Sequence, residues 1–136
     1  MDMDMTVNPN LWPSLGYHDA PAAVRFLVEG LGFDEVAHHP GTEPGRIDQA
    51  VLRWQDGSLI TLHSAEPDIV SFTELGGHSP VGIYLCTEDP DALYDRAVEA
   101  GGRPTGAPAD SPHGTRDATI TDPEGFSWSF GNYRGD

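Results

Sequence analysis

The sequence predicts an α+β fold built from two β-α-β-β-β modules. The first support is an internal duplication: segments 19–32 and 89–102 align without gaps, and Asp, Ala, Val, Glu and a final Gly recur in register. The second is a pair of acidic turns that contain glycine, at 56–57 and 122–125, each between two strand patterns. Glycine at a position of positive φ is the usual link between antiparallel neighbours. Each module is therefore expected to run strand, helix and then three strands.

Chain length limits how these modules are organised. A chain of 136 residues supports one hydrophobic core rather than two independent ones. We therefore expect a single domain over residues 1–136 in which both modules share a core. Module one covers 11–64, a connector covers 65–79, and module two covers 80–132.

The helix of module one is expected at 19–30. Asp19 can accept hydrogen bonds from the free N–H groups of the first turn, and Pro21 follows where a missing N–H does no harm. A glycine ends the helix. Its apolar stripe contains Ala23, Phe26, Leu27 and Leu31. The strands of this module are expected at 11–18, 33–39, 47–54 and 59–63.

Module two repeats this plan, with a helix expected at 90–100 after the capping residue Asp89. Its apolar stripe contains Ala92, Leu93 and Ala97, and glycine again ends the helix. Pro104 and Pro108 fit an edge strand better than a central one. The strands of this module are expected at 81–86, 103–108, 115–121 and 126–132.

Alternation along the strands separates a core face from a second face. The positions expected to face the helices are nearly all apolar, as a core requires: Leu15, Tyr17, Ala50, Leu52, Ile60, Leu62, Ile83, Leu85, Ala118, Ile120, Trp128 and Phe130. The second face carries Trp12, Ser14, Gly16, His18, Gln49, Val51, Arg53, Leu59, Thr61, His63, Gly82, Tyr84, Cys86, Ser127 and Ser129. Small residues leave room there, and Trp12 and Tyr84 provide flat walls, which is the composition of a binding cleft. Packing against the other module or a second subunit is an equal alternative for these two rings.

Charge and cysteine content exclude several classes of protein. The chain has 22 acidic and 7 basic residues, a net charge of −15, so clustered cations for nucleic-acid binding are lacking. The acidity serves either solubility and salt adaptation or the attraction of a cationic ligand. The single cysteine, Cys86, excludes an internal disulfide, and no run of eighteen apolar residues occurs. We expect a cytoplasmic protein without a membrane span.

Several of these features together resemble the vicinal oxygen chelate superfamily. They are the paired modules, the turn Asp122-Pro-Glu-Gly125, the segment Gly114-Thr-Arg116 that opens the preceding strand, and the Ala-rich helices that end at glycine. The superfamily includes glyoxalase I, extradiol dioxygenases, fosfomycin-resistance transferases and bleomycin-resistance proteins. The resemblance covers residues 11–132 and implies that each module curls into a half-barrel, with two facing modules enclosing a cleft. It also implies a homodimer when modules pair between chains.

The resemblance also places the metal ligands of the metal-dependent members. The first lies seven residues before the Asp that starts the helix, and another lies four residues after the turn glycine. In this chain those positions are Trp12, Thr61, Gly82 and Ser129. They replace the His and Glu of the metalloenzymes, and neutral hydroxyls are weak ligands for divalent ions. We therefore expect no metal, no other cofactor and no assigned catalytic residue.

The most favoured function is that of the metal-free, bleomycin-resistance-like branch. Such a protein binds a small aromatic molecule and sequesters it, as in antibiotic resistance. If the acidity of the chain serves to attract the ligand, that molecule is a cation. The expected ligand-binding residues are Trp12, His18, Arg53, Thr61, His63, Tyr84 and Ser129. The alternatives are a metal-dependent lyase, isomerase or dioxygenase with displaced ligands, for instance on His18 and His63, and a structural or regulatory module with a vestigial cleft.

Overall fold

The computed structural model describes residues 9–69 and 79–135, so 70–78 of the predicted connector lie outside the described residues. The elements of module one are β1 (Ser14–Tyr17), α1 (Ala20–Leu31), β2 (Asp34–Pro40), β3 (Ile47–Arg53) and β4 (Leu59–Ser64). Those of module two are β5 (Gly82–Cys86), α2 (Pro90–Glu99), β6 (Arg103–Asp110), β7 (Arg116–Thr121) and β8 (Ser127–Gly131).

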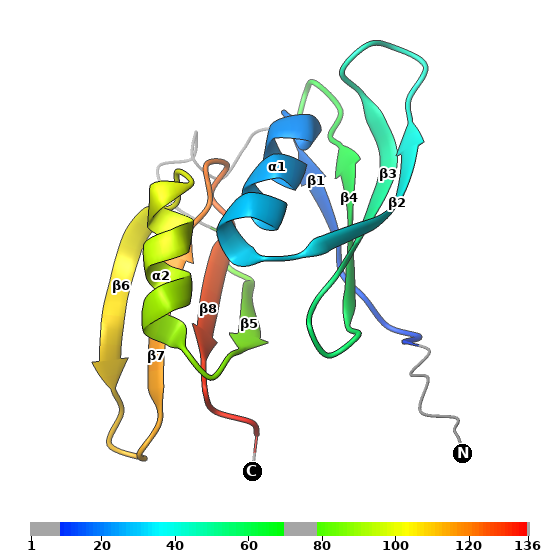
Figure 1. Cartoon of the computed structure of the whole chain (residues 1–136). Helices are drawn as coiled ribbons and strands as arrows, with labels where there is room; N and C mark the ends of the chain where they lie inside the picture. Colours follow the sequence, from blue (N-terminus) through cyan, green and yellow to red (C-terminus); the bar gives the residue numbers. More distant parts are fainter. Residues whose placement is uncertain (1–8, 70–78, 136) are drawn as a thin grey trace, which may run out of the picture.

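The strands form two four-stranded sheets, and the predicted α+β fold of two β-α-β-β-β modules is confirmed (Figure 1). The strand orders are β1-β4-β3-β2 and β5-β8-β7-β6. In each sheet the first strand of the module pairs in parallel with its last strand, and the other pairs are antiparallel. Within the described residues the two sheets stay separate and do not close into a barrel, so β1 and β5 are both edge strands.

The caps of α1 form as its sequence predicts. The Asp19 side chain accepts a hydrogen bond from the Ala22 N–H at 3.1 Å, and Gly32 ends the helix with φ of 86°. Arg96 of α2 adds a contact that the sequence did not predict, because its Nε donates to the Glu29 carbonyl at 2.6 Å. A cation at these last carbonyls stabilises the helix end, and here it also joins the two modules.

Helix α2 differs from its prediction in two details. Its last cap residue is Ala100, and the positive φ of 115° falls one residue later, at Gly101. Ala92, expected in the apolar stripe, is exposed, because the buried face of α2 is centred on Pro90, Leu93 and Ala97.

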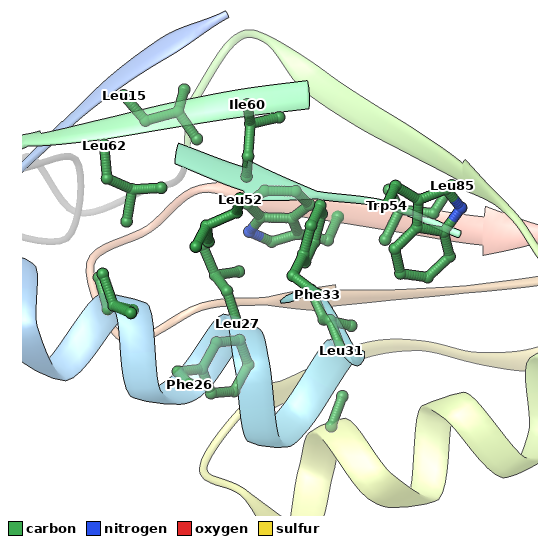
Figure 2. Close-up of a cluster of buried hydrophobic side chains, with 14 of the residues drawn as sticks. Leu15, Phe26, Leu27, Leu31, Phe33, Leu52, Trp54, Ile60, Leu62 and Leu85 are labelled. Atoms are coloured by element: carbon green, nitrogen blue, oxygen red, sulfur yellow. The ribbon is translucent and has the colours of Figure 1, made fainter. Parts of the chain in front are cut away.

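Predicted strand alternation agrees with the observed burial. Of the twelve positions expected to face the helices, all but Ile83 are buried, and Ile83 is partly buried against the same core. Figure 2 shows the α1 side chains Phe26, Leu27 and Leu31 in one cluster with side chains of the first sheet. The two modules therefore share one core, since side chains of both sheets belong to it.

Aromatic rings join the modules at the centre of this core. The Phe33 ring lies 5.1 Å from that of Trp54 and 5.9 Å from that of Trp128, between centroids. The Trp54 indole N–H also donates to the Cys86 carbonyl at 3.3 Å. Phe33 and Trp54 were expected only at strand ends, yet both are buried, because strand ends of one module lie against the other module.

The predicted bounds of two strands were wrong by more than one residue at an end. Strand β1 begins at Ser14 rather than at 11, because Pro13 has no N–H with which to extend the ladder. Strand β6 continues to Asp110, and its register with β7 is irregular around Gly106, as suits an edge strand that contains two prolines. No helix in the described ranges is long and apolar enough to span a membrane.

Candidate functional site

A pocket of about 420 Å³ opens beside the edge strand β1. Its walls come from β1, from the end of β4 and the residues after it, and from the β7–β8 turn of module two. The lining residues are Ser14, Leu15, Gly16, His18, His63, Ser64, Ala65, Glu66, Ile69, Glu124 and Phe126. Apolar walls with a few polar groups and a volume of this size are typical of small-molecule sites.

His63 is positioned by the neighbouring strand. In the parallel register, Gly16 of β1 lies opposite His63 of β4, and Ser14 lies opposite Thr61. The Ser14 hydroxyl and the His63 Nδ1 are 3.1 Å apart, which is a hydrogen bond whose donor depends on the imidazole tautomer. Two of the predicted ligand-binding residues, His18 and His63, therefore do line one pocket.

Glu124 fixes the wall that module two contributes. Its carboxylate accepts hydrogen bonds from the His18 and Asp19 backbone N–H groups, at 2.7 and 2.8 Å. These N–H groups lie where β1 passes into α1, so the carboxylate holds the start of α1 to the β7–β8 turn. A charged acceptor makes stronger hydrogen bonds than a neutral one, so these two bonds stabilise the contact between the modules.

Asp122, two residues earlier, is the buried centre of the same turn and is only 4% exposed. One carboxylate oxygen accepts the Tyr17 hydroxyl at 2.6 Å and the Trp128 indole N–H at 3.0 Å. The other accepts the backbone N–H groups of Glu124 and Phe126, both at 3.0 Å. Burial raises the pKa of the Asp122 carboxyl, and the Tyr17 and Trp128 hydrogen bonds oppose that rise. Burial, and then the neighbouring Asp122 carboxylate, hold the pKa of Tyr17 well above its ordinary value.

Sequence reasoning did not find the roles of Asp122 and Glu124. It identified their tetrapeptide as a turn, which is correct, since Gly125 has φ of 99°. Their partners in module one lie 105 or 106 residues away, so no local pattern could have indicated the contact. Asp122 and Glu124 reach the end of β1 only when the two modules pack together in the folded chain.

Comparison with known proteins identifies the family of this fold. The profile of the Glyoxalase/Bleomycin resistance protein/Dioxygenase superfamily matches residues 11–130. The chain belongs to this superfamily. The resemblance drawn from the duplicated modules is thereby confirmed at the level of the superfamily.

Individual relatives agree with this assignment. An uncharacterized protein of Mycobacterium bovis is 34% identical over 134 residues, which is 95% of this chain and 86% of that protein. The crystal structure of TioX from Micromonospora sp. ML1 has a TM-score of 0.72 at 27% identity, covering 93% of this chain and all 100% of TioX. The fosfomycin resistance protein FosX from Mesorhizobium loti has a TM-score of 0.66 at 14% identity over 96% of both chains, which shows the shared fold alone.

The four positions that the resemblance predicts for metal ligands do not carry side chains suited to a divalent ion. Trp12 precedes β1 and is 44% exposed, and Gly82 has no side chain. The Thr61 hydroxyl is buried and donates to the Pro13 carbonyl at 3.4 Å, while that of Ser129 is bonded to the Thr119 hydroxyl at 2.9 Å. None of these groups is an imidazole or a carboxylate. Among residues 9–69 and 79–135, no three His, Cys, Asp or Glu side chains are grouped so that they can hold a metal ion.

The remaining predicted ligand-binding residues lie apart from the β1–β4 pocket. Arg53 is exposed at the end of β3. Tyr84 is 40% exposed on β5, and its hydroxyl accepts a hydrogen bond from the Tyr133 N–H at 3.1 Å. It borders a separate hollow with Ser111, His113, Thr115, Asp117 and Tyr133. The structure thus brings together His18 and His63, and adds Glu66, Glu124 and Phe126 to them.

Proposed function

We propose that this superfamily member binds a small aromatic molecule in the β1–β4 pocket and sequesters it without using a metal ion. The pocket itself is the observation that carries the proposal, because its volume and its mixture of apolar walls and hydroxyl, imidazole and carboxylate groups suit such a guest. The superfamily includes bleomycin resistance proteins, so antibiotic sequestration is the activity we favour. The net charge of −15 favours a cationic guest over an anionic one.

A thermal-shift screen of antibiotics and aromatic metabolites tests this function. A true ligand at a hundred times its dissociation constant stabilises the folded chain by about 2.7 kcal/mol and raises its melting temperature. Metal analysis of protein purified without chelators tests the absence of a metal. A stoichiometric divalent ion whose removal abolishes an activity would instead favour the lyase, isomerase or dioxygenase alternative.

We also propose a homodimer. Among the strands of residues 9–69 and 79–135, β1 and β5 each have an unpaired edge, and an exposed edge is a template for pairing with another chain unless it is covered. Trp12, Tyr84 and Val81 are large apolar side chains left exposed at or next to these strands. A two-fold arrangement that places module one against module two of a second copy covers both edges at once. Sedimentation showing only a 14.6 kDa species at micromolar concentration would contradict this proposal.

A further inference from the structure

The orientation of His63 depends on the missing side chain of Gly16. A Cβ at position 16 would lie 3.0 Å from the His63 Nε2, which is tighter than most real Cβ contacts, so the ring would have to shift by a few tenths of an ångström. Glycine therefore leaves the space in which the ring reaches the Ser14 hydroxyl through Nδ1. Within residues 9–69 and 79–135, the Nε2 has no hydrogen-bond partner. This nitrogen is a free polar atom in a ring that lines the pocket.

The second copy of the duplicated unit lacks this arrangement. In module two, Cys86 lies opposite Gly131 at the register positions that Gly16 and His63 occupy in module one. The space beside Gly131 is filled, since a Cβ at 131 would lie 2.5 Å from the Arg116 carbonyl oxygen, 2.6 Å from the Asp117 Cβ and 2.8 Å from the Tyr84 hydroxyl. That hydroxyl is already bonded to the Tyr133 N–H. The β-α-β-β-β module can therefore fold without a histidine packed against a glycine at these positions. Of the two modules, only module one has this Gly16–His63 pair.

The charge of the pocket points to one class of guest. Glu66 and Glu124 line it, and no arginine or lysine is among its described lining residues. Both Glu124 oxygens are bonded to backbone N–H groups, and Glu66, whose side chain is 74% exposed, has only Arg46 at 3.7 Å. Arg46, which also donates to the carbonyls of Ser64 and Ala65, offsets one of these charges, and the remaining excess of negative charge attracts a cation and repels an anion. The Phe126 ring and the Ile69 side chain offer apolar walls for a flat ring.

We infer that Ser14, Gly16 and His63 form the recognition element of this pocket and that it selects planar organic cations over anions of the same shape. The inference rests on the proposed small-molecule function and specifies its ligand class. In the tautomer that carries its proton on Nδ1, His63 donates to the Ser14 hydroxyl and leaves Nε2 to accept a hydrogen bond from an N–H group of the cation. The two carboxylates supply the preference for positive charge.

Two fluorescent probes of nearly equal shape test the ligand class. The 9-aminoacridinium cation and the 9-anthracenecarboxylate anion share a three-ring skeleton and differ in charge. Titration of the full chain should show the cation binding at least about tenfold more tightly than the anion, a difference of about 1.4 kcal/mol. Salt should weaken the cation's binding, because exposed charges are screened.

Two glycine substitutions test the recognition element. Gly16→Ala displaces the His63 ring and should weaken binding of the cation at least about tenfold. Gly135→Ala adds the same methyl group near the end of the described chain, where nothing lies within 4 Å and no pocket residue is touched, and should change binding less than about twofold. Thermal melting of each variant separates a loss of binding from a loss of folding. Should Gly16→Ala fail to fold, Ser14→Ala, which removes the partner of Nδ1, is the second variant and should also weaken binding.

The possible outcomes distinguish a failure of this inference from a failure of the proposed small-molecule binding. If the anion binds as tightly as the cation and Gly16→Ala weakens both, the ligand class is wrong while the site stands. If Gly16→Ala and Ser14→Ala leave the affinity of the cation unchanged, the recognition element is wrong. If neither probe binds and the wider thermal-shift screen finds no ligand, the proposed function itself is overturned.

Discussion

The buried Asp122 carboxylate offers the sharpest test of how the two modules are joined. Replacing it with asparagine keeps the shape but changes one oxygen into an NH₂ group. The amide oxygen can still accept from the Glu124 and Phe126 N–H groups, so the NH₂ group then faces Tyr17 and Trp128. The Tyr17 hydroxyl can rotate and become an acceptor, but an indole N–H can only donate. One buried donor is left unsatisfied, which costs about 1–3 kcal/mol.

Urea unfolding followed by circular dichroism measures this cost. We expect Asp122→Asn to lose about 2 kcal/mol, and Asp122→Ala to lose more, because all four donors then lack their acceptor. Asp95→Asn is the matched control, since Asp95 is an exposed acid on α2, and it should stay within about 0.5 kcal/mol of the unchanged protein. A loss of less than about 0.5 kcal/mol for Asp122→Asn would refute the reasoning, because Trp128 would then have another acceptor.

Three further predictions concern single features of the chain. Tyr17 has a raised pKa in the folded state, so its contribution to stability is complete below about pH 10 and is lost as the pH rises further. In an absorbance titration of the native protein, one of the four tyrosines should therefore ionise only on unfolding. In Tyr17→Phe, no tyrosine should wait for unfolding to ionise. Trp12→Ala should cost less than the roughly 3–5 kcal/mol of a buried large-to-Ala change, because Trp12 is 44% exposed. It should change ligand affinity less than about twofold, because Trp12 does not line the β1–β4 pocket; a full-sized loss of stability would make it a packing residue. A variant with His at positions 12 and 82 and Glu at 61 and 129 has donors suited to zinc, so calorimetry should show zinc binding that the native chain lacks. Without zinc this variant should be less stable than the native chain, because position 61 is only 3% exposed and would hold a buried carboxylate. Equal zinc affinity in the native chain would contradict our placement of these positions.

The parts of the fold that could be predicted are those encoded by local patterns. The capping residues Asp19 and Asp89 and the glycines of the tight turns each act on their own neighbours, so their positions in the sequence are enough. Strand alternation also gave the core face, because a period of two assigns every second residue to one side. The end of β1 was misplaced where this period continues through Pro13 but the hydrogen-bond ladder does not.

The candidate site was only partly predictable. The period of two placed His18 and His63 on one face, and the structure puts both in the β1–β4 pocket. It could not show that Glu124 and Phe126 of the other module complete this pocket, because that contact depends on how the modules pack. It also could not show that Thr61, on the same face as His63, has its hydroxyl directed to the Pro13 carbonyl and is buried.

The two modules make a contact with opposite chemistry at equivalent positions, and the spaces beside these two contacts differ in size. Counted back from the turn glycines, Trp54 holds the place in module one that Asp122 holds in module two. Each reaches the end of the other module's first strand: the Trp54 indole donates to the Cys86 carbonyl, and Asp122 accepts from the Tyr17 hydroxyl. The hollow beside Trp54 is only about 180 Å³ and is lined in part by Arg134, whose guanidinium is bonded to a carboxylate of its own module. On the other side, Glu124 of the turn that contains Asp122 borders the β1–β4 pocket, which is about 420 Å³ and has no arginine among its described lining residues. Arg134 therefore narrows the space beside Trp54, and the larger space beside β1 is the one that we propose as the binding site.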